Sequence, residues 1–405
     1  MGGERWGIAE GTATVPRRRR NSAVGRRSAT ESRELPSLAQ RSILVVVPAH
    51  NEERDLEHCI ETILVQTRPA DRIAVVLDNC TDGTEELANK MRWRLEQDHR
   101  LPDLEVYTTK DNSDKKAGAL NQILLRQLLP DLDDGDMVLV LDADGWLLPD
   151  FLETGEAKLA RALDAGAVCG SYYGPPDRNG LIHLLQRNEY ARFARITNRQ
   201  KQQAYVLSGV SSMYRVATLR AVYRARISGK LPGVPGDLWN VTAATEDIEM
   251  THALKSLGYR PMAPANCQVH TDTMPTWEKL KHQRIRWQRG MLDSLGSYGL
   301  RKMSWNYYRK LLTLYASSLI PLLWALCVIG SYAAFGGVHW LTWWLLVIPF
   351  MIVERVVTVR REGTKAMLLA ALLLPEVTYE TWRSYLYWIA LFNWLRKTER
   401  VWHPT

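Results

Sequence analysis

Four short runs of apolar, largely β-branched residues recur in the first part of the chain, about thirty residues apart, which is the length of a βαβ unit. The runs are ILVVVP (43–48), IAVVLD (73–78), LEVYTT (104–109) and MVLVLD (137–142). Helical patterns lie between them, near residues 52–66, 82–99 and 115–129. Uninterrupted apolar strands that alternate with helices are typical of a mostly parallel sheet covered by helices on both faces. The sequence therefore predicts an α/β fold.

Polar signatures follow three of these runs at their carboxyl ends. They are PAHNEE after the first run, DNCTDGT after the second and DADG after the fourth. Because ligands bind outside the carboxyl ends of the strands in such sheets, we expect the three signatures to line one crevice. The chain has neither a GxGxxG nor a GxxxxGK[ST] motif with which to hold phosphate. A metal ion is the alternative way to hold it.

Asp142 and Asp144 stand two residues apart at the end of the fourth run. Residues i and i+2 of a strand project to one side, so the two carboxylates should aim at one point and repel each other unless a cation lies between them. Few hard oxygen ligands, completed by phosphate and water, suit Mg²⁺ or Mn²⁺. The alternative is an acidic turn that binds nothing. A calcium loop fits less well, because Trp146 and Leu147 stand where a ligand and a glycine belong.

Two further segments carry candidate functional residues. ATEDIEM (244–250) places Glu246 and Asp247 at a helix start with Thr245 as the N-cap, although acids there are also explained by the helix dipole alone. In MPTWEKLKHQRIRWQRGML (274–292), one face of a predicted amphipathic helix carries Gln283, Arg286 and Trp287. We expect this helix to rest on the cytosolic membrane surface. Its predicted basic flank consists of Lys279, Lys281, Arg284 and Arg289.

The composition changes sharply near residue 310. Residues 311–337 are uncharged and exceed the roughly 20 residues needed to span a bilayer, and a second apolar stretch follows at 341–353. Basic residues flank both stretches, which predicts a transmembrane hairpin at 307–360 with both ends in the cytosol. Residues 361–405 are interpreted as an interfacial or re-entrant helix, with a third span as the alternative. Since nothing in the N-terminal part resembles a secretory signal, we expect residues 1 to roughly 300 to stay in the cytosol.

The charge and the cysteines restrict the remaining possibilities. The formal net charge is +8, and residues 1–41, with nine Arg and four Glu, carry +5 of it. This segment predicts a disordered basic tail that either touches anionic lipid or is simply solvated. The rest is only mildly basic, and we expect no nucleic-acid partner. Five scattered cysteines favour a reducing compartment over a disulfide framework or a zinc site.

The motifs DNC, DADG, TED and QRIRW, in this order and followed by membrane spans, resemble the signature of the family 2 glycosyltransferases of the cellulose, chitin and hyaluronan synthase type. The resemblance covers roughly residues 43–300 and the first spans. It implies a Rossmann-like GT-A catalytic domain at 42–272, interface helices with the QRIRW motif at 273–306, and a C-terminal α-helical membrane region.

The resemblance also implies roles for individual residues. The implied donor-binding residues are His50, Glu52, Asp78, Lys116, Asp142 and Arg286. The implied metal ligands for Mn²⁺ or Mg²⁺ are Asp142 and Asp144. Asp247 is the implied general base, with Glu246 beside it. The implied acceptor-binding residues are Trp287, Gln283, Ser208 and Gly209. His270 is either a third metal ligand or a structural histidine. Trp239, in the long loop 228–241, is a further candidate for contact with donor or acceptor.

These observations lead to one main hypothesis and three competing ones. The main hypothesis is an inverting, metal-dependent transfer of a sugar from a nucleotide-diphosphate sugar, a UDP-sugar, to a glycan acceptor at the cytosolic membrane face. Two or three membrane helices are too few to enclose a polymer channel, which favours a protein or polyprenyl-phosphate acceptor instead. A sugar-phosphate nucleotidyltransferase and a non-catalytic membrane adaptor are the two remaining hypotheses.

Overall fold

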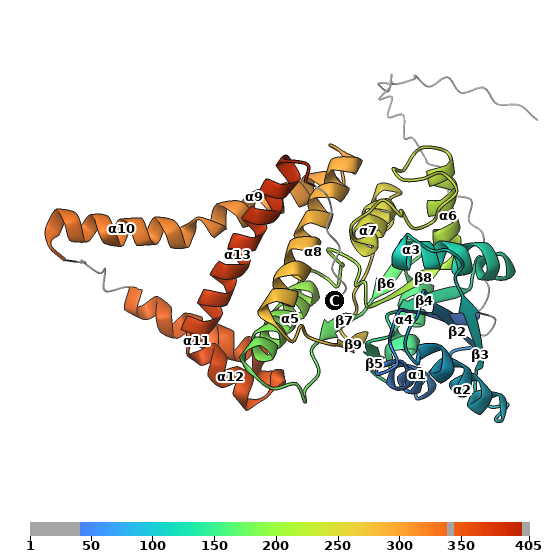
Figure 1. Ribbon diagram of the computed structural model, residues 1–405. Helices are drawn as coiled ribbons and strands as arrows, with labels where there is room; N and C mark the ends of the chain where they lie inside the picture. The colour runs from blue at the N-terminus through green and yellow to red at the C-terminus, as the bar shows by residue number, and fades with distance from the viewer. Residues whose placement is uncertain (1–40, 338–343, 399–405) are drawn as a thin grey trace, which may run out of the picture. The chain divides into compact units, whose positions relative to one another are not determined.

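A computed structural model describes residues 41–337 and 344–398 of the chain (Figure 1). Its larger sheet has the strand order β3-β2-β1-β4-β8-β6. Strands β1 to β4 are parallel to one another, whereas β8 runs antiparallel to both β4 and β6. The strands are β1 (Ile43–Ala49), β2 (Arg72–Leu77), β3 (Asp103–Thr108), β4 (Met137–Leu141), β6 (Ala167–Cys169) and β8 (Ser211–Arg215). The four predicted strands and the mostly parallel sheet are therefore confirmed.

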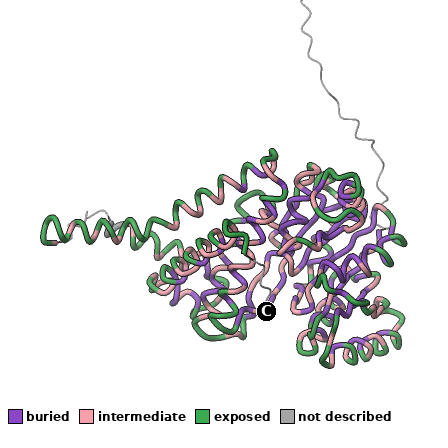
Figure 2. The backbone as a smooth tube through the Cα atoms, turned by 45° about the horizontal axis from the view of Figure 1, so that its top comes forward, coloured by how far each residue is buried: buried purple, intermediate pink, exposed green. Residues whose placement is uncertain are grey.

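Helices cover both faces of this sheet, which explains why its central strands β1 and β4 are apolar throughout. On β1, for example, Leu44 and Val46 face one hydrophobic core, and Val45 and Val47 face the other. Figure 2 shows the strands as mostly buried. One core packs against α1 (Leu56–Leu64), α2 (Thr84–Glu96) and α4 (Phe151–Arg161). The other packs against α3 (Lys115–Leu120), the π-helix η2 (Asn121–Leu128), α6 (Val216–Ile227) and α7 (Glu246–Ser256).

A second sheet has three strands in the order β5-β9-β7, and its first strand, β5, follows β4 in the sequence. Its strands are β5 (Gly145–Leu147), β7 (Ser171–Tyr173) and β9 (Gln268–Thr271). Gly145 pairs with Thr271 in the antiparallel β5–β9 ladder. A Cβ atom at Gly145 would lie 2.9 Å from the carbonyl oxygen of Asp142, so the chain can turn tightly here only with glycine. This sheet thereby anchors the acidic turn that connects β4 to β5.

The C-terminal helices pack against two earlier helices, α5 (Leu181–Arg199) and α8 (Trp277–Tyr298). Along its length α8 contacts α13, and α5 contacts α11 and α12 (Figure 1). The remaining bounds are α9 (Ser304–Ser318), α10 (Ile320–Phe335), α11 (Trp344–Val359), α12 (Thr364–Ala371) and α13 (Leu374–Leu395). The amphipathic helix predicted at 274–292 is thus present as α8. The predicted basic flank is wrong in one member, because Arg284 is only 2% exposed and pairs with a carboxylate of α5.

The apolar C-terminal region includes one helical stretch, Ser304–Phe335, that is long and apolar enough to cross a bilayer among the residues that the structure describes. Its most apolar window has a mean hydropathy of 2.0 and none of it is buried, and α10 is exposed along its length in Figure 2. This criterion rests on length and composition alone. The link of the predicted hairpin, 338–343, lies outside the described residues, as do 1–40 of the predicted basic tail. The hairpin and the tail stay predictions.

Candidate active site

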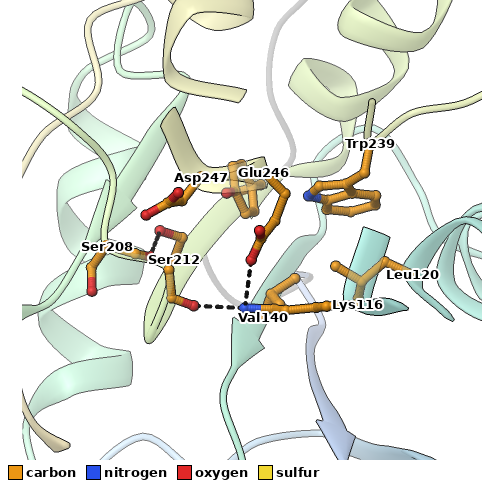
Figure 3. Close-up of a pocket in the computed structure, with 10 residues that line it drawn as sticks. Lys116, Leu120, Val140, Ser208, Ser212, Trp239, Glu246 and Asp247 are labelled. Atoms are coloured by element: carbon orange, nitrogen blue, oxygen red, sulfur yellow. Dashed lines mark hydrogen bonds and ion pairs between the residues drawn. The ribbon is translucent and has the colours of Figure 1, made fainter. Parts of the chain in front are cut away.

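The side chain of Lys116, near the start of α3, joins three segments that are far apart in the sequence (Figure 3). Its ammonium nitrogen donates to Oδ1 of Asp142 at 2.5 Å and to the carbonyl oxygen of Gly209 at 2.8 Å. It also lies 3.4 Å from Oε1 of Glu246. The turn after β4, the loop before β8 and the start of α7 therefore meet at one cation.

A pocket opens beside this ammonium group (Figure 3). Its lining is polar on one side and apolar or aromatic on the other, and it consists of Lys116, Leu120, Val140, Ser208, Gly209, Ser212, Tyr214, Trp239, Glu246 and Asp247. The rings of Tyr214 and Trp239 meet edge to face, with centroids 6.4 Å apart. Sequence reasoning identified Trp239 but missed Ser212 and Tyr214. A signal for this pair was available, because Ser212 and Tyr214 stand two residues apart on β8 and such residues share one face of a strand.

Trp239 is held in the pocket wall by Asn121, the first residue of η2. The Asn121 side chain is 2% exposed. Its Oδ1 accepts from the backbone N–H groups of Leu238 and Trp239 at 3.0 and 2.9 Å, and its Nδ2 donates to the Trp239 carbonyl oxygen at 2.8 Å. A buried amide that satisfies three backbone groups fixes the loop in place. The sequence shows an asparagine in KKAGALN but not these partners, which lie more than a hundred residues away.

The turn after β4 concentrates negative charge. Asp142 and Asp144 lie in the turn itself rather than in the strand, since β4 ends at Leu141. Burial raises the pKa of Asp142, and burial together with the neighbouring Asp142 raises the pKa of Asp144 to about 7. Burial, followed by repulsion from Asp144 and Asp142, raises the pKa of Glu52 to about 8. Three carboxyl groups thus disfavour one another's ionisation here.

The donor chemistry of this turn fits a hard divalent cation. The two aspartates supply carboxylate oxygens and carry the like-charge strain that a cation relieves. Within residues 41–337 and 344–398, no group of three or more His, Cys, Asp or Glu side chains is placed to hold a metal. Further ligands would therefore come from phosphate and water. The Nδ1 atom of His270 lies 3.3 Å from the carbonyl oxygen of Gly174, in line with the structural alternative for this histidine.

The TED segment begins α7, with Thr245 in the N-cap position. Burial opposes the ionisation of Glu246, but the charges of Lys116 and Arg286 together with hydrogen bonds outweigh burial and lower the pKa of Glu246. Burial and the negative charge of Glu246 raise the pKa of Asp247 to about 7. A Cβ atom at Gly209 would lie 3.2 Å from Oδ2 of Asp247, so this carboxylate sits directly against the Ser208–Gly209 backbone. The carboxyl group of Asp247, with its raised pKa, therefore forms part of the pocket lining.

Arg286 of α8 is close enough to these carboxylates to act on them electrostatically, and it favours the ionised forms of Asp142, Glu246 and Asp247. Its Nε atom is buried and has no hydrogen-bond partner among the described residues. A half-buried guanidinium with a donor to spare suits an anionic ligand.

The two acceptor candidates on α8 are less directly placed. Oε1 of Gln283 accepts from Nη1 of Arg284 at 2.9 Å, and the Trp287 ring has the Arg284 guanidinium 4.4 Å from its centroid. Neither Gln283 nor Trp287 lines the pocket.

The nucleotide-binding candidates lie in the loops after β1 and β2. Oδ1 of the buried Asp78 accepts from Thr109 Oγ1 at 2.8 Å and from Asn112 Nδ2 at 2.7 Å. His50 is exposed, and its Nδ1 lies 2.6 Å from the Asp78 carbonyl oxygen. The structure thus brings His50 and Asp78 together. Sequence reasoning missed Thr109 and Asn112, which hold the Asp78 carboxylate from the third strand end.

Two family models match the chain and together cover its sheet and its first C-terminal helices. Residues 44–222 match the family described as Glycosyl transferase family 2, and residues 137–357 match Glycosyl transferase family group 2. The chain belongs to the family 2 glycosyltransferases. The enzyme is therefore a glycosyltransferase, and its family favours sugar transfer over the nucleotidyltransferase and adaptor hypotheses.

Curated relatives of this glycosyltransferase are distant. Glycosyltransferase GlyA of Streptococcus pneumoniae is 25% identical over 206 residues, which are 48% of this chain and 26% of the relative. Beta-monoglucosyldiacylglycerol synthase of Synechocystis is 26% identical over 251 residues, 61% of this chain and 47% of the relative. Poly-beta-1,6-N-acetyl-D-glucosamine synthase of Staphylococcus aureus is 25% identical over 257 residues, which are 61% of this chain and 54% of the relative. The chain spans between a quarter and just over half of the length of these relatives.

One solved structure shares the fold of this glycosyltransferase along most of its length. It is a mannosyltransferase from Pyrobaculum calidifontis in complex with GDP-Man and Mn²⁺, with a TM-score of 0.54, 20% sequence identity and 90% of each chain covered. The mixed α/β sheet and this likeness support the predicted GT-A catalytic domain.

Proposed function

We propose that this glycosyltransferase transfers a sugar from a nucleotide-diphosphate sugar, a UDP-sugar in the first instance, to a glycan acceptor with inversion at the anomeric carbon. The observation that carries the proposal is the meeting of Asp142, Gly209 and Glu246 at the Lys116 ammonium group. This arrangement puts a charged anchor for a diphosphate and a carboxylate that can take up a proton, Asp247, on the wall of one pocket.

The proposed reaction is a single displacement. The acceptor hydroxyl oxygen forms a bond to the anomeric carbon from the face opposite the leaving group, while the bond from that carbon to the diphosphate oxygen breaks. The hydroxyl proton passes to Asp247, whose raised pKa suits a general base near neutral pH. The bonding electrons leave with the nucleoside diphosphate, whose charge Arg286 and Lys116 stabilise. His50 and Asp78 hold the base and ribose in this proposal, with Glu52 beside the acidic turn.

Asp142 and Asp144 are the residues that would hold Mn²⁺ or Mg²⁺ at the diphosphate. A bound divalent ion supplies charge neutralisation for the leaving group. The related mannosyltransferase structure contains Mn²⁺ and GDP-Man, which supports a divalent ion in this enzyme as well. The strain between the two carboxyl groups gives an independent reason, because a cation would remove it.

The glycan acceptor is proposed to lie between the pocket and α8. Ser208 and Gly209 line the pocket on the side of Asp247, and Trp287 offers an aromatic face to a sugar ring. Gln283 lies on the same face of α8. A relative named as a poly-beta-1,6-N-acetyl-D-glucosamine synthase supports a growing glycan as the acceptor.

A lipid acceptor is the second candidate, and the apolar stretch Ser304–Phe335 favours it. None of the most apolar window of that stretch is buried, so the proposal places the enzyme in a membrane with its catalytic domain in the cytoplasm. A relative named as a beta-monoglucosyldiacylglycerol synthase also fits a lipid acceptor. The two candidates differ in whether the product partitions into water or into organic solvent.

The proposal is tested with the purified full chain in detergent, Mn²⁺, and a panel of sugar nucleotides that includes UDP-glucose, UDP-N-acetylglucosamine and GDP-mannose. We expect release of nucleoside diphosphate with at least one donor. Asp247→Asn should lower turnover by about 10²- to 10⁴-fold, the usual contribution of a general base, while nucleotide binding measured by calorimetry stays unchanged. Asp164→Asn, at an exposed ion pair with Arg260, is the matched control and should behave like wild type.

Two results would contradict the proposal. One is the absence of nucleoside diphosphate release with every donor, and the other is normal turnover by Asp247→Asn. Mass spectrometry of the aqueous and organic phases then identifies which molecule has gained the sugar.

A further inference from the structure

A partly buried carboxylate on α5, that of Glu189, connects the QRIRW helix to the C-terminal helix α13. Oε2 of Glu189 accepts from Nη2 of Arg284 at 2.9 Å and from the Tyr379 hydroxyl at 2.6 Å. Oε1 of Glu189 lies 2.5 Å from Nη1 of Arg383. Arg284 belongs to α8, whereas Tyr379 and Arg383 belong to α13. One side chain of the catalytic part thus holds two helices that follow it in the sequence.

Glu189 is charged under all ordinary conditions. Burial alone would oppose its ionisation, but Arg284 and Arg383 outweigh burial and lower its pKa to about 2. A partly buried charge that is shared between two guanidinium groups depends on both of them, since removal of one leaves the carboxylate less compensated. The geometry of Arg284 is therefore set by α5 and α13 together.

Arg284 in turn contacts the Trp287 ring. Its guanidinium group is stacked 4.4 Å from the centroid of that ring and 5.8 Å from the centroid of Tyr190. It also donates to Gln283. Two of the proposed acceptor residues, Gln283 and Trp287, thus contact a guanidinium group whose orientation Glu189 fixes.

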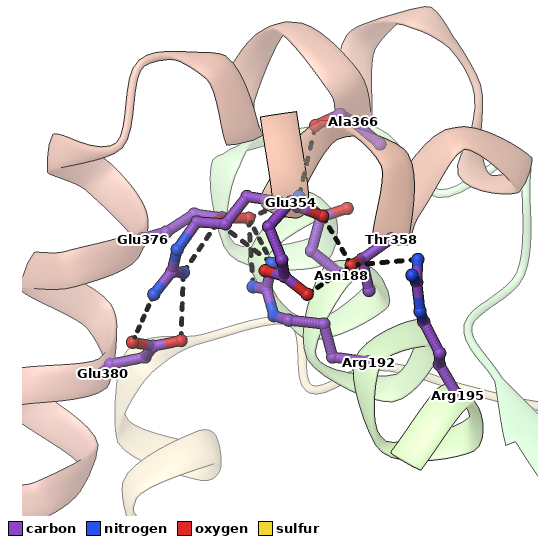
Figure 4. A network of polar contacts seen from close by, with 9 residues as sticks. Asn188, Arg192, Arg195, Glu354, Thr358, Ala366, Glu376 and Glu380 are labelled. Carbon is purple, nitrogen blue, oxygen red and sulfur yellow. Dashed lines mark hydrogen bonds and ion pairs between the residues drawn. The ribbon is translucent and has the colours of Figure 1, made fainter. Parts of the chain in front are cut away.

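A second buried node fixes the register of α13 against α5 (Figure 4). Glu376 is completely buried and accepts from Asn188 at 2.7 Å, from Arg192 at 3.0 Å and from Arg355 at 2.9 Å. On α13, Glu376, Tyr379 and Arg383 recur at intervals of three and four residues, so they lie on one face. On α5, Asn188 and Arg192 are four residues apart and lie on one face, and Glu189 is the residue next to Asn188. The two nodes together connect α13 to α5 at three positions along one face of α13.

Building on the proposed function, we infer that α13 is a part of the acceptor site: Tyr379 and Arg383 are positioning residues that hold Trp287 through Glu189 and Arg284. Neither α13 residue needs to touch the acceptor itself. The acceptor affinity then depends on the C-terminal helices, while donor binding and the reaction of the donor with water depend on the sheet, Lys116 and Arg286.

The inference is tested by a signal from Trp287 itself, which needs no known acceptor. The full chain is labelled with 5-fluorotryptophan in detergent micelles, and the Trp287 resonance in the ¹⁹F spectrum is assigned by its loss in Trp287→Phe. Arg383→Met removes one ion-pair partner of Glu189, and Arg383→Lys keeps the charge as the conservative rescue. Tyr379→Phe removes a single hydroxyl group and is the variant to use if Arg383→Met does not fold. Arg260→Met, at an exposed ion pair with Asp164, is the matched control.

We expect Arg383→Met and Tyr379→Phe to shift the Trp287 resonance by more than its line width. The resonances of Trp277 and Trp382, whose rings contact Tyr379, shift as well, while that of Trp239 in the pocket wall stays in place. Arg383→Lys should return the resonance towards its wild-type position, and Arg260→Met should leave it there. An unchanged Trp287 resonance in a folded Arg383→Met or Tyr379→Phe variant overturns the inference. A shift of all tryptophan resonances in Tyr379→Phe does so as well, because it indicates a general structural role.

Kinetics separate this inference from the proposed function. For an acceptor that wild type uses, Arg383→Met should raise the acceptor KM roughly tenfold or more, as expected when a binding group is displaced by a fraction of an ångström. Release of nucleoside diphosphate by water, measured with donor alone, should not change. A parallel loss of both activities contradicts a positioning role. If wild type transfers no sugar at all, the proposed function fails, but the Trp287 resonance still decides the inference.

Discussion

Gly290 of α8 packs directly against Thr245 of the TED segment, and replacing this glycine should impair catalysis from outside the pocket. A Cβ atom at position 290 would overlap Oγ1 of Thr245 and would lie 2.7 Å from its Cγ2 and 2.9 Å from its Cβ. Since carbon atoms pack best at about 3.5–4.0 Å, α8 and the TED turn would have to separate by roughly 1 Å. Thr245 directly precedes Glu246 and Asp247, so the displacement reaches the candidate base.

We expect Gly290→Ala to lower kcat by up to about 10²-fold, the loss typical of a misplacement of this size. Overpacking should also lower the free energy of unfolding by about 1–3 kcal/mol. Both are measured on the same preparation, by nucleoside diphosphate release and by denaturant unfolding. Gly296→Ala is the matched control in the same helix, because a Cβ there would make only an ordinary 3.4 Å contact with Trp394.

A second-site variant makes this prediction sharper. Thr245→Ala removes two of the three overlapping atoms, and Oγ1 of Thr245 has no hydrogen-bond partner among the described residues, so little is lost with it. The double variant Gly290→Ala/Thr245→Ala should recover most of the lost activity. The reasoning is refuted if Gly290→Ala is as active and as stable as Gly296→Ala.

Two further predictions concern pH and stability. Because burial and Glu246 raise the pKa of Asp247 to about 7, Asp247 is protonated and inactive as a base at low pH, so kcat should rise about tenfold per pH unit below 7 and then level off. A rate that is flat from pH 5 to 8 would contradict this assignment. The ion pair of Arg226 and Glu249 is almost completely buried, so Glu249→Gln should lower the free energy of unfolding by about 3–5 kcal/mol, as measured in denaturant. Equal stability of Glu249→Gln and wild type would show that the pair contributes little.

The sequence predicted those parts of the fold that depend on local pattern. The first four strands could be found because each is a short, largely apolar run between helical patterns. The proximity of the PAHNEE segment to Asp78 and to the acidic turn follows from the geometry of a parallel sheet. The antiparallel strands β8 and β6 and the second sheet were not predicted. Their strands are three to five residues long and pair with partners distant in sequence, which leaves no local signal.

The candidate site was predicted as a set of residues rather than as a set of contacts. Helical spacing placed Arg284 on the basic flank of α8, because a sequence pattern does not reveal that its partner, Glu189, lies 95 residues earlier. For the same reason the Lys116–Asp142 pair appeared only in the structure. The two aspartates were expected to need an external cation, and the protein itself supplies one to Asp142. Asp144, by contrast, accepts a hydrogen bond from a neutral donor, the Thr271 hydroxyl, at 3.3 Å.

The measurement that tests the central claim most directly is the anomalous scattering of manganese in crystals of the full chain grown with Mn²⁺ and UDP. The account predicts one strong peak within coordination distance of the Asp142 and Asp144 carboxylates and of the diphosphate, with Arg286 on the phosphate side. A manganese peak elsewhere, or UDP bound without the ion away from the Lys116 pocket, would contradict it.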